Sequence, residues 1–347
     1  MTDSAVDMHE MADPADGFDI ASYDEFGLLR FNAEHGGLPY AGPPPARRVG
    51  VDGGDGHQVS AILWGSSASS AVPGEDGEPK PSLVFLHGRG QNSHTWDTVL
   101  LGLDLPALAI DLPGHGHSDW REDKNYSPPV LADAVAAAIR AFASPPVFVV
   151  GMSMGGMTTM ALAARHPQLV SGGVIVDITP GTGQRMAQMT EAQKGAVALV
   201  AGPASFPSFD ALVDEMMRAT PDRTRASLAR GAAHNAVPAP DGTWAWRYDQ
   251  GRGASFRPPA AGAGGAGSGG AAAGTMAALW DDLSAATAPL TLVRAGASFF
   301  THDDDVAEFL RRKPGTPVHV VAGSGHSVQS DRPNELVAII REAMAGL

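Results

Sequence analysis

Residues 147–165 read VFVVGMSMGGMTTMALAAR, and this stretch decides the fold. Residues 147–152 form a short apolar run typical of a buried strand, and residues 154–165 have the small and apolar character of a helix. Between them, the motif GMSMGG at 151–156 lets the backbone turn sharply, because its small residues avoid collisions. Such a turn holds its central residue in a strained, exposed conformation. We therefore expect Ser153 to project above a sheet as a nucleophile.

Apolar runs and helix-like segments alternate along much of the chain. The expected strands are residues 47–51, 58–64, 82–87, 107–111, 147–152, 173–177, 290–294 and 318–321. The expected helices are residues 92–101, 130–142, 154–165, 303–313 and 332–345. This alternation predicts an α/β fold with a mostly parallel sheet that helices cover on both faces. Catalytic groups in such sheets gather at the carboxyl ends of the strands.

The chain divides around this core. Residues 1–45 are acidic and lack apolar periodicity, so we expect a largely disordered N-terminal tail. Residues 46–177 and 276–347 form the expected core. Residues 178–275 interrupt the alternation and are predicted to form an inserted helical lid, with a flexible Gly/Ala-rich linker at 260–274.

The composition excludes several classes of protein. With 24 basic and 38 acidic residues, the net charge of −14 disfavours nucleic acid and anionic membrane surfaces as partners. The absence of cysteine among the 347 residues excludes a disulfide framework, a thiolate nucleophile and a Cys-ligated zinc. The start of the chain lacks the basic and apolar segments of a signal peptide, and no apolar run is long enough to cross a bilayer. We expect a cytoplasmic protein whose partner is a small-molecule substrate.

A segment upstream of the serine offers a backbone donor to its site. The sequence HGRG at 87–90 follows an expected strand. Its loop can present the N–H of Arg89 to a developing oxyanion, and the N–H of Met154 at the helix start can supply a second donor. We interpret His87 as a buried histidine that supports this loop and takes no part in proton transfer.

A nucleophilic serine needs a general base, because its hydroxyl is protonated at neutral pH. His326 lies in the Gly-rich segment AGSGHS at 322–327, after the last expected strand, where its imidazole can reach the serine. His115 and His117, in DLPGHGHS at 111–118, also follow a strand, but their spacing suits a tight loop. No third ligand accompanies them, so we expect neither a metal site nor a cofactor.

The order of these motifs carries a family resemblance. HG at 87–88, DLPGHG at 111–116, GMSMG at 151–155 and GH at 325–326 together resemble the α/β-hydrolase fold superfamily. The resemblance covers the chain from about residue 47 onward, apart from most of the insertion. It implies a serine hydrolase that cleaves a small, partly apolar carboxylic ester, lactone or amide. The reaction would use a Ser-His-Asp triad and an acyl-enzyme.

The acid of that triad is not at the family's commonest position. There this chain has Ser298 or Phe299, and neither can hold an imidazolium. Asp177, after the strand that follows the nucleophile helix, is one replacement; its surrounding sequence is similar to that of small esterases whose acid is this aspartate. Asp303 is the other, although an acidic residue there also suits a helix N-terminus. We favour Asp177, for which a capping role is the alternative.

The insertion is rich in methionine and aromatic residues, and three aromatic residues alternate in a strand-like pattern at 244–249. The set comprises Met186, Met189, Phe206, Phe209, Met216, Met217, Trp244, Trp246 and Tyr248. These side chains either line a pocket for a partly apolar substrate or form the core of the lid. Two other functions stay open: a protein that binds or senses a small molecule without hydrolysis, and a carbon–carbon hydrolase or perhydrolase. The oligomeric state is open as well.

Overall fold

The computed structural model describes residues 20, 23–65, 80–183, 202–221, 223–250 and 269–347. Within these ranges the main sheet has eight strands in the order β1-β2-β4-β3-β5-β6-β10-β11. Their bounds are β1 (Ala46–Asp52), β2 (Gln58–Trp64), β3 (Leu83–Leu86), β4 (Ala107–Ile110), β5 (Val147–Met152), β6 (Val170–Val176), β10 (Leu290–Ala295) and β11 (Val318–Val321). Strand β2 runs antiparallel to β1 and β4, and the strands from β4 to β11 are parallel. The predicted mostly parallel sheet is confirmed.

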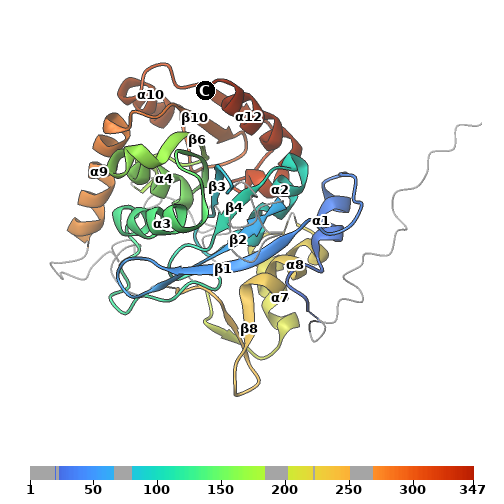
Figure 1. Ribbon diagram of the computed structural model, residues 1–347. Coiled ribbons are helices and arrows are strands. Elements are labelled where there is room, and N and C mark those ends of the chain that lie inside the picture. The colour runs from blue at the N-terminus through green and yellow to red at the C-terminus, as the bar shows by residue number, and fades with distance from the viewer. Residues whose placement is uncertain (1–19, 21–22, 66–79, 184–201, 222, 251–268) are drawn as a thin grey trace, which may run out of the picture.

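Helices cover both faces of this sheet (Figure 1). One face packs against α3 (Pro128–Phe142), α4 (Met154–Arg165), α9 (Gly269–Ala285) and α10 (Asp303–Arg312). The other packs against α1 (Leu29–His35), α2 (Asp97–Leu103), α11 (Val328–Asp331) and α12 (Pro333–Ala345), and short 3₁₀ turns occur at Ser93–Trp96 and Pro167–Leu169. In β5, Val149 contributes to the first core and Val150 to the second. Both faces being buried explains why the strands read as continuous apolar runs.

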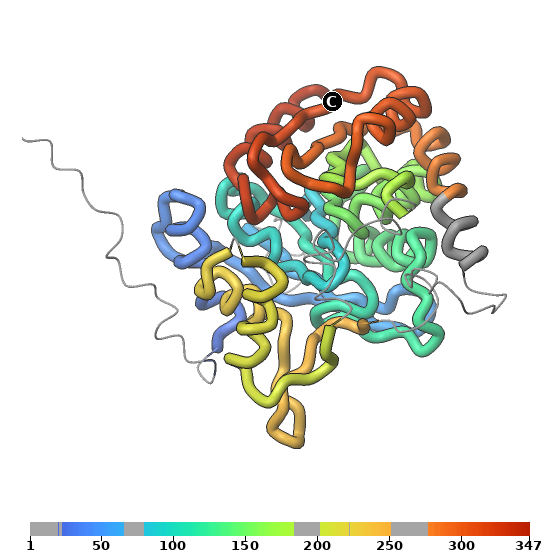
Figure 2. The backbone as a smooth tube through the Cα atoms, turned by 180° about the vertical axis from the view of Figure 1, so that it is seen from behind, coloured from blue at the N-terminus to red at the C-terminus, as the bar shows by residue number. Residues whose placement is uncertain are grey.

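The insertion builds a cap of its own, shown in yellow in Figure 2. Its elements are β7 (Ser205–Phe206), α7 (Phe209–Ala219), α8 (Arg225–Asn235), β8 (Ala236–Pro238) and β9 (Trp244–Trp246). In addition to the expected helices, the cap has a small antiparallel sheet in the order β7-β9-β8. Strand β9 lies within residues 244–249, where the alternating aromatic residues predicted a strand. Its aromatic and methionine side chains pack with Leu212 and Leu228 as the core of the cap. Met186 and Met189 lie outside the described residues.

Two boundaries differ from those expected. Residues 23–45 of the predicted tail pack against the body, because α1 buries Leu29 and Ala33, while residues 1–19 and 21–22 lie outside the described part. The predicted linker overlaps α9, whose first turns include residues 269–274, because alanine is the best helix former. Helix α9 packs beside α4, with Leu279 and Leu283 in the hydrophobic core, so the core resumes within this helix. The rest of that linker, residues 260–268, is not among the described residues.

Among the helices of the described ranges, none is both long and apolar enough to cross a membrane.

Candidate active site

Ser153 lies at the turn between β5 and α4, at the carboxyl edge of the sheet. Its backbone angles, φ 52° and ψ −115°, are sparsely populated for a residue with a side chain. Such a conformation costs about 1–3 kcal/mol and persists only where the surroundings enforce it. Here the Ser153 N–H donates to the Val176 carbonyl at 3.1 Å, and the Met157 N–H donates to the Ser153 carbonyl at 3.0 Å. The strained turn predicted from the sequence is therefore present and held from both sides.

Glycine is required on both sides of this serine because the backbones approach very closely. A Cβ at Gly155 would lie 2.1 Å from the Leu86 carbonyl oxygen, and one at Gly151 would lie 2.4 Å from the Gly155 carbonyl oxygen. Atoms cannot approach to these distances, so the turn and strand β3 pack together only with hydrogen at both positions. This contact brings the loop after β3 against the start of helix α4.

That loop contains Arg89, a predicted oxyanion donor, and the side chain of His87 fixes the orientation of its peptide. The Leu112 N–H donates to His87 Nε2 at 2.9 Å, so the ring proton is on Nδ1, which donates to the Gly88 carbonyl at 2.8 Å. In a trans peptide the carbonyl and the following N–H point in opposite directions, so the Arg89 N–H is directed away from His87. Burial lowers the pKa of His87, which keeps the ring neutral. A Cβ at Gly88 would lie only 3.3 Å from Ser153 Cβ, so the loop passes directly beside the serine.

His326 and Asp177 meet across the sheet edge. His326 Nδ1 lies 2.8 Å from Asp177 Oδ2, and the Asp177 side chain is fully buried. The other carboxylate oxygen, Oδ1, accepts the Ala295 N–H at 3.1 Å, and the Asp177 N–H donates to the Val293 carbonyl at 2.7 Å. Asp177 also has a positive φ of 49°, which turns the chain at the end of β6. The alternative role for Asp177, capping a helix, does not match these contacts, because the carboxylate bonds a strand amide and an imidazole.

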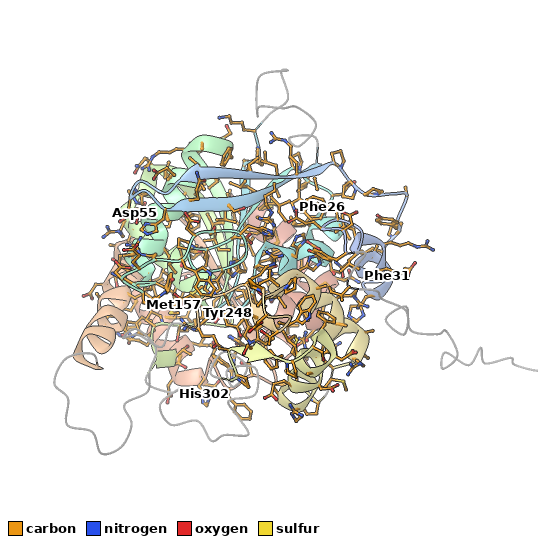
Figure 3. All side chains as sticks on the ribbon, turned by 90° about the horizontal axis from the view of Figure 1, so that it is seen from below. Phe26, Phe31, Asp55, Met157, Tyr248 and His302 are labelled. Atoms are coloured by element: carbon orange, nitrogen blue, oxygen red, sulfur yellow. The ribbon has the colours of Figure 1, made fainter. Side chains whose placement is uncertain are left out.

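Asp303, the rival acid, lies elsewhere. Its side chain is 91% exposed and forms an ion pair with Arg294 at the start of α10. Figure 3 shows the neighbouring His302 at the edge of the molecule, whereas Tyr248 of the cap lies near the centre of the view. At the family's commonest acid position, Ser298 Oγ accepts the Phe300 N–H at 3.1 Å. Of the two candidates, the structure brings Asp177 to His326.

The other histidines considered from the sequence have contacts typical of loop residues. His115 is buried, and its Nδ1 atom bonds the Pro113 carbonyl at 3.1 Å. The pKa of His115 is lowered well below its usual range, mainly by burial and secondly by the neighbouring His87. His117 is partly exposed, and its N–H donates to the Asp111 carboxylate at 3.0 Å. Both residues help to shape the turn after β4.

The cap is bonded directly to the loop that carries Arg89, a feature for which the sequence offered no signal. At the end of α8, Asn235 Nδ2 donates to the Gly90 carbonyl at 2.6 Å. Asn92 Nδ2 donates in turn to the His234 carbonyl at 3.0 Å and contacts Asn235 Oδ1 at 3.3 Å. The loop that carries Arg89 is therefore held by two amide side chains, one from the core and one from the cap.

A second feature that sequence reasoning missed is an aromatic contact with His326. The Phe300 ring stacks on the imidazole with centroids 3.6 Å apart and an interplanar angle of 11°. Phe300 is buried, whereas the adjacent Phe299 is 49% exposed. Nothing in the sequence distinguishes these two phenylalanines, because their positions depend on the path of the loop after β10.

A cluster of His94, Asp97 and His234 has the residue types of a metal site, with its ligand atoms within 4.8 Å of one another. Its geometry does not suit a shared ion. The two imidazole rings are stacked 3.8 Å apart at 14°, so their lone pairs lie in nearly parallel planes and do not converge. Both His94 nitrogens already face carboxylates, with Nδ1 3.1 Å from Asp97 and Nε2 3.2 Å from Glu25. Although burial opposes the charge, Asp97 and Glu25 raise the pKa of His94 to about 9. The cluster is an ion-pair network that joins the N-terminal segment, the core and the cap.

A comparison with family models identifies the wider group to which this architecture belongs. The model of the Alpha/beta hydrolase family matches residues 83–339. The chain belongs to the alpha/beta hydrolase family. The matched part runs from β3 into α12, so this family's core includes the elements that carry Ser153, Asp177 and His326.

Individual family members resemble the chain to different extents. Esterase Rv0045c of Mycobacterium tuberculosis is 46% identical over 325 residues, which cover 93% of this chain and 96% of that protein. A solved structure of the M. tuberculosis esterase, 45% identical, covers 93% of this chain and 99% of its own with a TM-score of 0.75. The 2-(acetamidomethylene)succinate hydrolase of Mesorhizobium japonicum is 28% identical over 73% of this chain and 84% of that protein. A structure of E-2-(acetamidomethylene)succinate hydrolase, 21% identical with a TM-score of 0.66, shares the fold.

Proposed function

We propose that this protein is a serine hydrolase that cleaves a small, partly apolar carboxylic ester, with Ser153, His326 and Asp177 as its catalytic triad. The observation that carries the proposal is the 2.8 Å contact between His326 Nδ1 and the buried carboxylate of Asp177. It occurs at the same sheet edge as the strained turn at Ser153. The 46% identity to a mycobacterial esterase over nearly the whole chain supports the ester as the substrate class.

The chemistry follows from the roles that these positions allow. His326 Nε2 removes the proton from the Ser153 hydroxyl, and Ser153 Oγ attacks the ester carbonyl to form a tetrahedral intermediate. Asp177 holds the Nδ1–H tautomer of His326 and stabilises the imidazolium that forms. The imidazolium then protonates the alcohol oxygen as the bond from the carbonyl carbon to that oxygen breaks. The alcohol departs, and the acyl group remains on Ser153 as an acyl-enzyme. Water, deprotonated by the same imidazole, releases the carboxylic acid and regenerates Ser153.

Two backbone amides would hold the oxyanion. The Met154 N–H is in the first turn of α4, where amides have no partner within the helix. The Arg89 N–H is directed away from His87 by the bond between His87 and the Gly88 carbonyl. Donors fixed in advance stabilise the developing charge without reorganisation during the reaction, and each is worth about 10²- to 10³-fold in kcat.

A fluorophosphonate probe tests the proposal, because it labels only an activated serine. We expect the wild-type protein to be labelled and to hydrolyse p-nitrophenyl butyrate. Ser153→Ala should abolish both, whereas Ser144→Ala, which changes an exposed serine on the surface, should leave both unchanged. A folded wild-type protein without labelling or turnover would overturn the proposal and favour a binding function.

A further inference from the structure

We propose that Phe300 is a positioning residue for His326, which it aligns and stabilises in its protonated form through a face-to-face contact. The inference rests on the proposed function of His326 as general base. The two rings lie 3.6 Å apart between centroids and 11° from parallel. Two neutral aromatic rings prefer offset or edge-to-face packing. A close parallel stack is electrostatically better suited to a ring that carries positive charge over the partner's electron-rich face.

Two hydrogen bonds hold the backbone of Phe300, and a third anchors the threonine that makes one of them. Thr182 Oγ1 donates to the Phe300 carbonyl at 2.9 Å and accepts the Thr179 N–H at 3.2 Å. Ser298 Oγ accepts the Phe300 N–H at 3.1 Å. Thr179 and Thr182 belong to the segment that directly follows Asp177, so the loop that carries Phe300 is joined to the segment after the triad acid. The ring also packs into the larger hydrophobic core.

This arrangement supplies a constraint that Asp177 alone cannot. The bond from Asp177 fixes His326 at Nδ1, but the imidazole can still pivot about that bond. A flat ring packed parallel to one face blocks the pivot on that side, so Nε2 cannot swing toward it. Precise alignment of the base matters because small displacements of a catalytic group lower rates strongly.

Phe300 also acts on the charge of His326 at the step where charge develops. When the Ser153 proton moves to Nε2, the imidazole becomes a cation lying over the Phe300 face. The carboxylate on this ring is Asp177, at Nδ1. Three other charged groups lie beside this loop: Asp331, which accepts the Gly325 N–H at 2.8 Å, its ion-pair partner Arg223, and Arg332, whose guanidinium is next to Gly323. The aromatic face therefore adds to the attraction from Asp177 in stabilising the imidazolium.

The test compares Phe300→Leu, Phe300→Tyr and the matched control Phe299→Leu. Leucine keeps an apolar side chain but removes the aromatic face, so we expect kcat to fall by about 5- to 30-fold with KM within twofold, the range of a partly desolvated cation–π contact. The acid limb of the pH profile of kcat/KM should move to lower pH, because the imidazolium loses a stabilising partner. Tyrosine keeps the face and should restore most of kcat, and Phe299→Leu should match the wild type.

Three results would overturn the inference: an unchanged kcat in Phe300→Leu, an equal loss in Phe300→Tyr, or a raised KM with kcat unchanged. The last would mean that Phe300 contacts substrate. If Phe300→Leu does not fold, Thr182→Val and Thr182→Ser provide the test, because only serine keeps the hydroxyl that holds the Phe300 carbonyl. Valine should lower kcat and serine should restore it, and equal rates would contradict the proposal. Failure of the triad itself would appear separately, as labelling that survives in Ser153→Ala.

Discussion

His326 Nδ1 lies 2.8 Å from Asp177 Oδ2, although 149 positions of sequence separate the two residues. The parallel sheet makes this contact, since β6 and β11 both pair with β10 and so end close together. The carboxylate is buried and bonded to a strand amide, so its position relative to the imidazole is fixed before a substrate binds.

The first prediction concerns this pair. Asp177→Asn should lower kcat by about 10⁴-fold, because an amide that donates to Nδ1 favours the wrong imidazole tautomer. Asp303→Asn should change kcat less than twofold, since that side chain is exposed and paired with Arg294. Steady-state kinetics on an aryl ester, with circular dichroism to check folding, compare the two variants. The reverse ranking would assign the triad acid to Asp303.

The second prediction concerns the bond between the cap and the loop that carries Arg89. Asn235→Ala removes the donor to the Gly90 carbonyl, so we expect kcat to fall about tenfold as the Arg89 amide loses its fixed position. The free energy of unfolding should fall by about 1 kcal/mol, the usual net contribution of a hydrogen bond, because this bond is only part-buried. Asn334→Ala removes a similar part-buried amide–carbonyl bond, to Gly36, which joins α12 to the end of α1 and does not involve the loop at 87–90. It should affect stability alone, and an equal loss of kcat in both variants would contradict the role given to Asn235.

The third prediction concerns the glycine at the nucleophile turn. Gly155→Ala would place a Cβ 2.1 Å from the Leu86 carbonyl oxygen, so strand β3 and helix α4 must separate. We expect the free energy of unfolding to fall by about 3 kcal/mol or more, as for overpacked cores. Gly231→Ala in α8 is the control, because its Cβ would meet no atom within 4 Å. It should stabilise the protein by up to about 1 kcal/mol through helix propensity. Urea unfolding measures both changes, and a tolerated Gly155→Ala would show that the turn is less tightly packed.

The fourth prediction concerns the pH dependence of stability. The pKa of His94 is raised from 6.5 to about 9, because Asp97 and Glu25 outweigh burial, so the folded protein keeps a proton that the unfolded chain releases. This contribution is complete below pH 6.5 and is lost as the pH rises through 9. Between these values the gradual loss of this contribution lowers the free energy of unfolding by up to about 1.4 kcal/mol per pH unit. His94→Gln should remove that slope in urea titrations at several pH values, and an identical slope in both proteins would contradict the network.

The sequence determined the architecture and singled out the candidate reactive groups. Strand–helix alternation predicted the parallel sheet, and the glycines around Ser153 predicted its strained turn, because both are properties of a short segment. The boundaries were harder. Residues 23–45 lack apolar periodicity, yet a few buried contacts of Leu29 and Ala33 with the body order helix α1. The predicted linker contains alanines that in fact begin helix α9. The same composition suits a flexible linker and a helix, and packing decides between the two.

Only the tertiary structure decided which of two aspartates meets His326, and which of two adjacent phenylalanines covers its ring. Asp177 and Asp303 both follow strands of one sheet, and Phe299 and Phe300 are chemically identical. Their roles depend on where a loop crosses the sheet edge, which is set by contacts distant in sequence, such as Thr182 with the Phe300 carbonyl. The sequence by itself therefore specified the fold and the two residues that we propose as nucleophile and base, Ser153 and His326. The folded chain selected the carboxylate and the aromatic face beside that base, because those choices depend on distances between segments and not on local pattern.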